Sequence, residues 1–293
     1  MSSRFPERRA APVGVPRRIR DLPAWLRPVL FTLLLAAPLA AAAEARALRV
    51  CADPDNLPFS DRAEAGFENR IARLVADELQ ATLAYEWQPQ RRGFVRRTIG
   101  ADLCDLVIGV PTGFERLLTT RPYYRSAYAF VQPANAARLD SFDDPRLPSL
   151  RIGVQLIGND LAATPPGHAL ARHGALEHVV GYTIYGDGSA FDRMTGDLAA
   201  GRLDALVLWG PQAGYFANRS AGRYRVAFAQ PPADVAQPFD FAISMGVRRG
   251  DRTLQQELDR VIAQRAPEIA AILDAYGVPR LPLPAGAGNE APR

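Results

Sequence analysis

The twelve residues VCADPDNLPFSD, Val50–Asp61, bring together a thiol, three carboxylates and an amide. Their types allow three kinds of site: a nucleophilic thiolate, a calcium loop, or the polar lip of a binding pocket. A catalytic thiolate needs a neighbouring histidine or a helix N-terminus that favours ionisation. All three histidines, His168, His173 and His178, lie far along the chain. The sequence therefore argues against catalysis by Cys51.

A calcium loop would need alternating oxygen ligands and a glycine at its sharp turn. Leu57, Pro58 and Phe59 stand where those ligands or the glycine would be. Two interpretations of the stretch remain. It is a proline-stiffened turn that Asp53 caps, or it is the lip of a cleft that presents Asp53, Asn56 and Phe59 to a ligand.

Cys51 and Cys104 are the two cysteines of the chain. An even count favours a disulfide in an oxidising compartment. However, Cys51 falls late on its expected strand, whereas Cys104 precedes the start of its own. If the two strands are parallel neighbours, an offset of three to four residues separates the cysteines by roughly 10 Å, beyond the reach of a bridge. A Cys51–Cys104 disulfide and two free thiols both stay open.

Two further sets of side chains allow more than one interpretation. Arginines 91, 92, 96 and 97 flank Gly93-Phe94, and they mark a solvated helix start, an anion contact from Arg92, or a surface for an acidic partner. Tyrosines 123, 124 and 128 and Trp209 either line a cleft or pack at a hinge. The histidines recur every five residues, which rotates a helix by about 140°, so they share no face and predict no metal site.

The basic character of the chain belongs to its first residues. Residues 1–43 hold seven of the 35 arginines and two of the 31 acids, so the remainder is close to neutral and shows no nucleic-acid footprint. Arginines precede the apolar run VLFTLLLAAPLAAAA, which predicts a secretory signal cleaved near Ala43 or Ala45. The run is short for a membrane span and contains Pro38, although a retained anchor is the alternative. We expect a periplasmic protein without stable membrane insertion.

Apolar strand-like and amphipathic helix-like segments alternate along the chain, which predicts an α/β fold with parallel sheets. Two such series suggest two lobes, joined by two extended hinge strands. Lobe 1 is expected at 46–133 plus 238–279 and lobe 2 at 134–237, followed by a disordered tail at 280–293. Small ligands usually bind in the cleft between such lobes. The chain shows no Walker loop, dinucleotide fingerprint or G-x-S-x-G motif, so no cofactor is predicted.

Several strings of the sequence resemble the type II periplasmic solute-binding proteins, among them CADPDNLPFS, GFENRIARLVADEL and CDLVIGVPTGFERLLTTRPYYRS. The likeness extends over residues 47–279. A narrower set is similar to the MxaJ/XoxJ-type proteins: VCADPDNLPFS, PQRRGFVRRT, LTTRPYYRS and WGPQAGYFA. Those proteins accompany periplasmic quinoprotein (PQQ) alcohol dehydrogenases. The resemblance therefore implies the two-lobe type II fold.

The sequence departs from amino-acid receptors of that fold in one place that matters. Such relatives hold the ligand ammonium with an Asp at the end of the strand LDALVLW, where this chain has Trp209. Arg116 occupies the position of their carboxylate-binding Arg, in a segment about three residues shorter. Amino-acid capture is therefore not expected. The cleft residues that we predict are Asp53, Asn56, Phe59, Arg92, Arg116, Tyr123, Gln155 and Trp209.

The resemblance implies a non-enzymatic accessory protein that docks to a quinoprotein (PQQ) alcohol dehydrogenase, to its c-type cytochrome, or to both, with small-ligand binding as an additional expectation. The alternative is the substrate-binding component of an ABC importer for a small organic acid or another polar solute. A second alternative is a dehydratase-like enzyme on the same fold. That enzyme would need a general acid or base in the cleft, and Asp53 alone supports it weakly.

Overall fold

A computed structural model describes residues 46–157, 163–185 and 188–283 of the chain. All of them belong to one compact unit, Ala45–Arg293. The predicted signal peptide lies outside the described residues. Within those ranges, none of the helices combines the length and the apolar character that crossing a bilayer requires.

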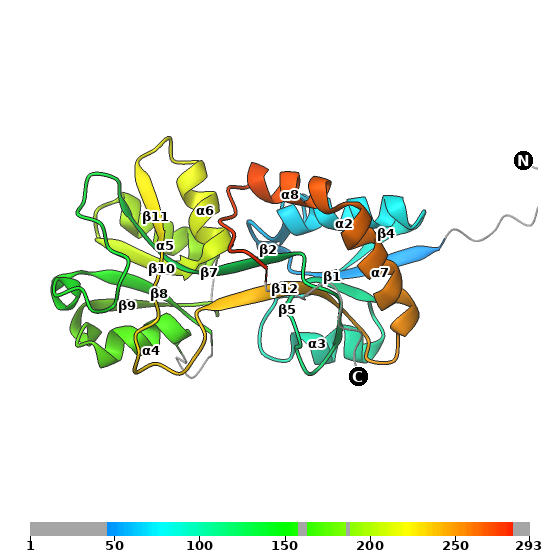
Figure 1. Ribbon diagram of the computed structural model, residues 1–293, viewed down its shortest axis with the longest axis horizontal. Coiled ribbons are helices and arrows are strands. Elements are labelled where there is room, and N and C mark those ends of the chain that lie inside the picture. The colour runs from blue at the N-terminus through cyan, green and yellow to red at the C-terminus, as the bar shows by residue number, and fades with distance from the viewer. Residues whose placement is uncertain (1–45, 158–162, 186–187, 284–293) are drawn as a thin grey trace, which may run out of the picture. The chain divides into compact units, whose positions relative to one another are not determined.

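Lobe 1 is built on a mostly parallel sheet. Its strands, in spatial order, are β4 (Thr82–Trp87), β1 (Ala47–Ala52), β5 (Leu106–Pro111) and β12 (Asp240–Val247), of which β12 runs antiparallel to β5. Three helices share one core with the sheet: α2 (Phe67–Glu78), α7 (Arg252–Gln264) and α8 (Ala266–Ala275). The opposite face carries the short helix α3 (Phe94–Arg97) (Figure 1). Covered on both faces, the strands are almost continuously apolar.

Lobe 2 repeats this design. The strand order is β7 (Tyr124–Pro133), β10 (Ala205–Trp209), β8 (Ile152–Leu156) and β9 (Val179–Thr183), with β11 (Tyr224–Phe228) on the other side of β7. Helix α4 (Pro165–Arg172) packs on one face, whereas α5 (Ala190–Ala199) and α6 (Gly210–Asn218) pack on the other (Figure 1). The parallel order of β8, β9 and β10 follows from these helical crossovers.

Short elements complete the chain. They are the strands β2 (Asp55–Asn56), β3 (Ser60–Asp61) and β6 (Leu118–Thr119), and the 3₁₀ helices η2 (Ile99–Ala101), η3 (Leu147–Ser149) and η4 (Leu176–His178). Strands β2 and β3 form a separate hairpin within the stretch 50–61.

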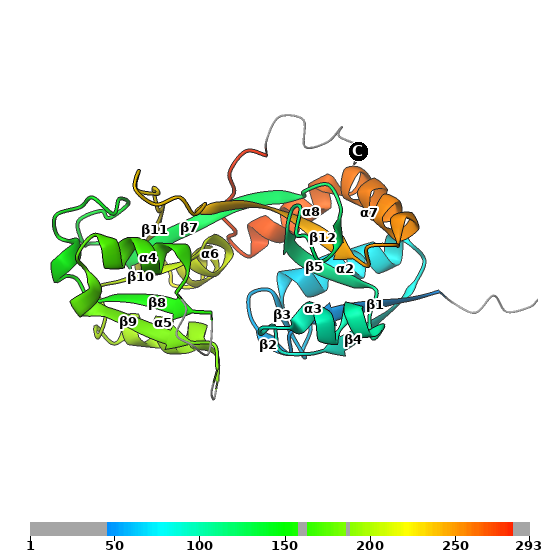
Figure 2. The ribbon, with the colours of Figure 1, turned by 90° about the horizontal axis from the view of Figure 1, so that it is seen from below.

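Strands β7 and β12 join the two lobes into one ten-stranded sheet. They pair in antiparallel register from Tyr124 with Ile243 to Ala127 with Asp240 (Figure 2). From Tyr128 onward β7 pairs with β10, so this half of the strand belongs to lobe 2. The crossing therefore lies several residues before the break at 133/134 that the sequence suggested, because β7 continues without interruption through the hinge.

Cys51 and Cys104 form a disulfide, with Cα atoms 5.5 Å apart. The offset of roughly 10 Å assumed that the chain before β5 stays extended. Instead it turns at Asp102, whose φ is 58°, and the Asp105 N–H donates to the Arg49 carbonyl at 2.8 Å. Cys104 is thereby placed on the α3 face of the sheet, in a buried cluster with Cys51 and Phe94.

The segment after α8 is ordered against the hinge. The Leu281 N–H donates to the Arg125 carbonyl at 2.8 Å, and the Ser126 hydroxyl donates to the Pro279 carbonyl at 2.7 Å. The expectation that disorder begins at Arg280 is therefore wrong for residues 280–283. The hinge strand β7 provides hydrogen-bond partners that hold this segment in place. Residues 284–293 of the predicted tail lie outside the described ranges.

Candidate ligand-binding cleft

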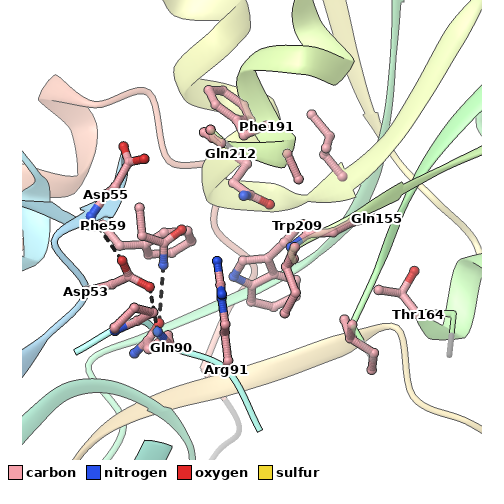
Figure 3. A pocket seen from close by; sticks show the side chains of 18 of the residues that line it. Asp53, Asp55, Phe59, Gln90, Arg91, Gln155, Thr164, Phe191, Trp209 and Gln212 are labelled. Carbon is pink, nitrogen blue, oxygen red and sulfur yellow. Dashed lines mark hydrogen bonds between the residues drawn. The ribbon is translucent and has the colours of Figure 1, made fainter. Parts of the chain in front are cut away.

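A cavity of about 430 Å³ lies between the lobes, and we call it the outer chamber. Lobe 1 contributes the turn after β1 and the loop Pro89–Arg92, and lobe 2 contributes the ends of β8 and β10 with the starts of α5 and α6 (Figure 3). The carboxyl ends of parallel strands meet at one edge of a sheet, where α/β folds bind their ligands. The topology thus explains why the chamber forms here.

Asp53 connects the two lobe 1 segments of the chamber. Its carboxylate accepts hydrogen bonds from the backbone N–H groups of Asp55, at 3.0 Å, and Gln90, at 2.6 Å. The Asn56 side-chain amide donates to the Gln90 side-chain oxygen at 3.2 Å (Figure 3). Asp53 therefore caps the turn, as one interpretation of the sequence proposed, and at the same time lines the chamber. The Asp53 carboxylate thus holds the turn after β1 and the loop at Gln90 in position.

The lobe 2 wall of the outer chamber contains the beginnings of three helices. Thr164, Ser189 and Trp209 are the N-cap residues of α4, α5 and α6, and all three line the cavity. Only α5 starts without proline and so presents N–H groups, because Pro165 and Pro166 begin α4 and Pro211 follows the first residue of α6. Arg91 and Arg92 line the cavity from lobe 1. Asp53 and Asp55 line the same cavity, so the outer chamber presents charges of both signs.

A second cavity of about 330 Å³ lies beside the first, and we call it the inner chamber. It shares five lining residues with the outer chamber: Asn56, Phe59, Gln90, Tyr128 and Trp209. Trp209 packs edge-on against Tyr128 and Phe241, with ring centres 5.4 and 5.8 Å apart. Burial raises the pKa of the Tyr124 hydroxyl, whereas Trp209 lowers that pKa by less. Five of the twelve residues that line the inner chamber are aromatic.

Glu68 is the titratable acid of the inner chamber, and the sequence-based prediction missed it. It occupies the first turn of α2, where the helix N-terminus would ordinarily lower the pKa of a carboxyl. Burial, together with the nearby charge of Asp53, instead raises the pKa of Glu68 to about 8. Glu68 is the acid of the string GFENR, which is part of the resemblance to solute-binding proteins. The neighbouring sequence contains no signal that this end of the helix faces a cavity.

Six of the eight predicted cleft residues line the chambers: Asp53, Asn56, Phe59, Arg92, Gln155 and Trp209. Arg116 does not. It lines a separate surface hollow beside α3, because Leu117 is anchored in the buried cluster around the disulfide on that face.

Tyr123 is also outside the chambers. Its hydroxyl donates to the Ile108 carbonyl at 3.0 Å, and its ring packs against the lobe 1 core. The neighbouring Tyr124 lines the inner chamber instead. Successive side chains of an extended segment point to opposite sides, so only one of the two tyrosines can do so.

The histidines lie apart from both chambers. His168 and His178 are exposed, and His173 contacts Asp234 at 3.2 Å and Asp143 at 3.6 Å. Among the described residues, no group of three or more His, Cys, Asp or Glu side chains is arranged to hold a metal ion.

Two α/β lobes, two hinge strands and a ligand-sized interlobe cleft define the class of two-lobe periplasmic-binding-protein folds. No family model matches the sequence. Protein MoxJ from Paracoccus denitrificans is 32% identical over 266 residues, which cover 85% of this chain and 94% of that protein. Protein MoxJ from Methylorubrum extorquens is 32% identical over 265 residues, which cover 83% and 85%. The chain belongs to the MoxJ family.

The solved structures include a similar protein. The crystal structure of periplasmic binding protein XoxJ from Methylobacterium extorquens AM1 matches with a TM-score of 0.66 and 38% identity, over 80% of this chain and 100% of that one. This similarity agrees with the predicted type II two-lobe fold and with the predicted MxaJ/XoxJ likeness, and confirms both.

Proposed function

We propose that this protein is a non-enzymatic periplasmic accessory protein of a PQQ-dependent alcohol dehydrogenase system. The observation that carries the proposal is the match to MoxJ proteins over almost their whole length. The lack of a carboxylate at the end of β10 supports it, because Trp209 occupies that position. The accessory protein acts by docking to the dehydrogenase or to its c-type cytochrome.

The surface beside α3 offers a basis for such docking. Arg96, Arg116 and Arg249 are exposed around one hollow of about 370 Å³. Across the described ranges, none of these three forms an ion pair with a carboxylate. Several other arginines of the described residues pair with a carboxylate, as Arg49 does with Asp105 at 2.6 Å. We call Arg96, Arg116 and Arg249 the arginine patch, and we propose that it meets an acidic face of the partner.

A pull-down from the periplasm of alcohol-grown cells tests the proposal. The tagged protein should capture the quinoprotein dehydrogenase or its cytochrome, and raised salt should weaken the complex. The double variant Arg116→Glu/Arg249→Glu should reduce the association rate at least tenfold, whereas a reversal of a lobe 2 arginine, Arg225→Glu, should not. Capture of neither partner at micromolar concentration would overturn the accessory function.

A second candidate function is a receptor for a small organic acid. The basis for it is the N-terminus of α5 and Arg91, both of which line the outer chamber. A ligand at a hundredfold excess over its Kd should stabilise the protein by about 2.7 kcal/mol. If a broad panel of organic acids produces no shift in thermal unfolding, this function fails, and the docking proposal is unaffected.

A further inference from the structure

The inner chamber combines one carboxyl group with aromatic walls. Glu68 reaches it from α2, and Tyr124, Tyr128, Trp209 and Phe241 form much of the remaining surface. Organic cations are recognised by a negative group that stands beside aromatic rings. The carboxylate and the rings each attract positive charge, and more strongly where water is excluded. The docking function proposed above uses neither the Glu68 carboxyl group nor these aromatic side chains.

The Glu68 carboxyl has no partner of its own in the described part of the chain. None of the hydrogen bonds or ion pairs there reaches its side-chain oxygens, although its own N–H donates to the Phe59 carbonyl at 2.9 Å. The Glu68 side chain is half-buried, and partial burial of a carboxylate without donors carries a cost that a ligand with a positive charge or an N–H group reduces.

Among the described residues, the charged group that shifts the pKa of Glu68 is the Asp53 carboxylate, and no cation is found in this role. The titratable groups that interact with it are Asp53 from the turn after β1, Tyr85 from β4, Tyr123 just before β7, and Tyr124 at the start of β7. Burial raises the pKa of all three tyrosines, so they stay neutral, and Asp53 is negative. The protein therefore leaves the counter-charge for Glu68 to be supplied from outside.

Gly109 on β5 makes room for the carboxyl. A Cβ atom at this position would lie 2.1 Å from Glu68 Oε1, so any larger residue would displace the group. Gly109 itself lines the inner chamber. The glycine thus seats the carboxyl against the strand, where it faces the cavity.

We propose that the inner chamber binds a small organic ammonium group, with Glu68 as its counter-ion and Trp209, Tyr128 and Phe241 as its aromatic walls. In the amino-acid receptors that the sequence resembles, the carboxylate that binds the ammonium group stands at the end of the strand equivalent to β10. In this protein the carboxylate would come from lobe 1 instead. A ligand that also carries an acid group could extend it into the outer chamber. The inference does not depend on any dehydrogenase partner.

The protonation of Glu68 gives this site a characteristic pH dependence. With its pKa raised to about 8, the group is neutral in most molecules at pH 6 and ionised in most at pH 9. A cation binds the ionised form, so binding releases a proton and tightens as the pH rises. Below about pH 8 the apparent Kd should fall by up to tenfold for each unit of increase.

Choline is the probe, because its charge is permanent and only the protein titrates. Isothermal titration of the wild-type protein should give an affinity at least tenfold tighter at pH 9 than at pH 6. The neutral isostere 3,3-dimethylbutan-1-ol has the same shape without the charge, and it should bind more weakly than choline at pH 9 with no such pH dependence. Equal binding of the two compounds would contradict the proposal.

Three variants separate the site from general effects. Glu68→Gln keeps the shape and should abolish both the preference for the cation and its pH dependence. Gly109→Ala should weaken choline binding at least tenfold by displacing the carboxyl, while Glu78→Gln on the same helix should bind as the wild type does. Unchanged choline binding by folded Glu68→Gln, or no binding to the wild type at millimolar concentration and pH 9, would overturn the inference.

Discussion

The guanidinium carbon of Arg91 lies 5.2 Å from the centre of the Tyr185 ring and so connects the two lobes across the mouth of the cleft. Arg91 belongs to the lobe 1 loop that Asp53 positions, and Tyr185 follows β9 in lobe 2. Hinge closure is the usual motion of a fold with two lobes and a cleft. This cation–π contact therefore favours the closed arrangement.

Removal of this contact should shift the lobes toward an open form. An exposed cation–π pair contributes about 0.5–1 kcal/mol, which corresponds to roughly a two- to fivefold change in the ratio of open to closed molecules. Small-angle X-ray scattering should show a larger radius of gyration for Arg91→Ala and for Tyr185→Leu. Arg96→Ala, which removes an exposed arginine away from the mouth, should match the wild type. Unchanged scattering in both cleft variants would contradict the role of the contact.

The disulfide should contribute substantially to stability, because it closes a long loop of lobe 1 across 53 residues. The double variant Cys51→Ser/Cys104→Ser should lose about 2–4 kcal/mol of unfolding free energy. Urea unfolding measures this loss. Reductant should destabilise the wild type by a similar amount and leave the double variant unaffected. If reductant shifted both proteins equally, the effect would not come from this bridge.

Asp53 should matter for stability as well as for the cleft. Asp53→Ala leaves two backbone N–H groups without their acceptor, which should lower the unfolding free energy by about 1–3 kcal/mol. Asp55→Ala, two residues away, should change it by less than about 0.5 kcal/mol, because in the described ranges the Asp55 carboxylate accepts no hydrogen bond. Thermal unfolding compares the two. Equal stabilities would mean that Asp53 does not hold the lip in place.

Glu68 should make stability depend on pH in a known direction. Its pKa is raised from the ordinary 4.5 to about 8, so in this range the folded state holds a proton that the unfolded state has released. The contribution of Glu68 is thus present at low pH and is lost as the pH rises to about 8.

Glu68→Gln removes this titration. Relative to the wild type, its unfolding free energy should rise by about 1.4 kcal/mol per pH unit between pH 5 and 8, and the difference should stay constant above. Denaturant unfolding at pH 5.5, 7 and 9 gives this difference. Glu78→Gln should show no such trend, and a pH-independent difference for Glu68→Gln would contradict the raised pKa.

Local patterns predicted most of the fold because each lobe is a series of strands and helices with distinct apolar periods. Phe67, Ile71 and Val75 recur every four residues, a spacing that predicts one face of a helix, and all three are buried in α2. The boundary at β7 could not be predicted in this way, because one continuous strand changes its pairing partner at Tyr128 without any change in local composition. The same reason explains the Cys51–Cys104 bridge, which depends on a turn at Asp102.

By itself the sequence predicted the two-lobe α/β class and reduced the interpretations of Val50–Asp61 to a capped turn or the lip of a cleft. It also showed that an indole replaces a carboxylate at residue 209. Only the tertiary structure decided that Glu68 faces a cavity beside Trp209, that Tyr124 takes the place expected for Tyr123, and that Arg116 belongs to a different surface. Residue types and periods report which side chains are buried within an element. Which buried groups face each other across a cleft depends on contacts between segments far apart in the chain.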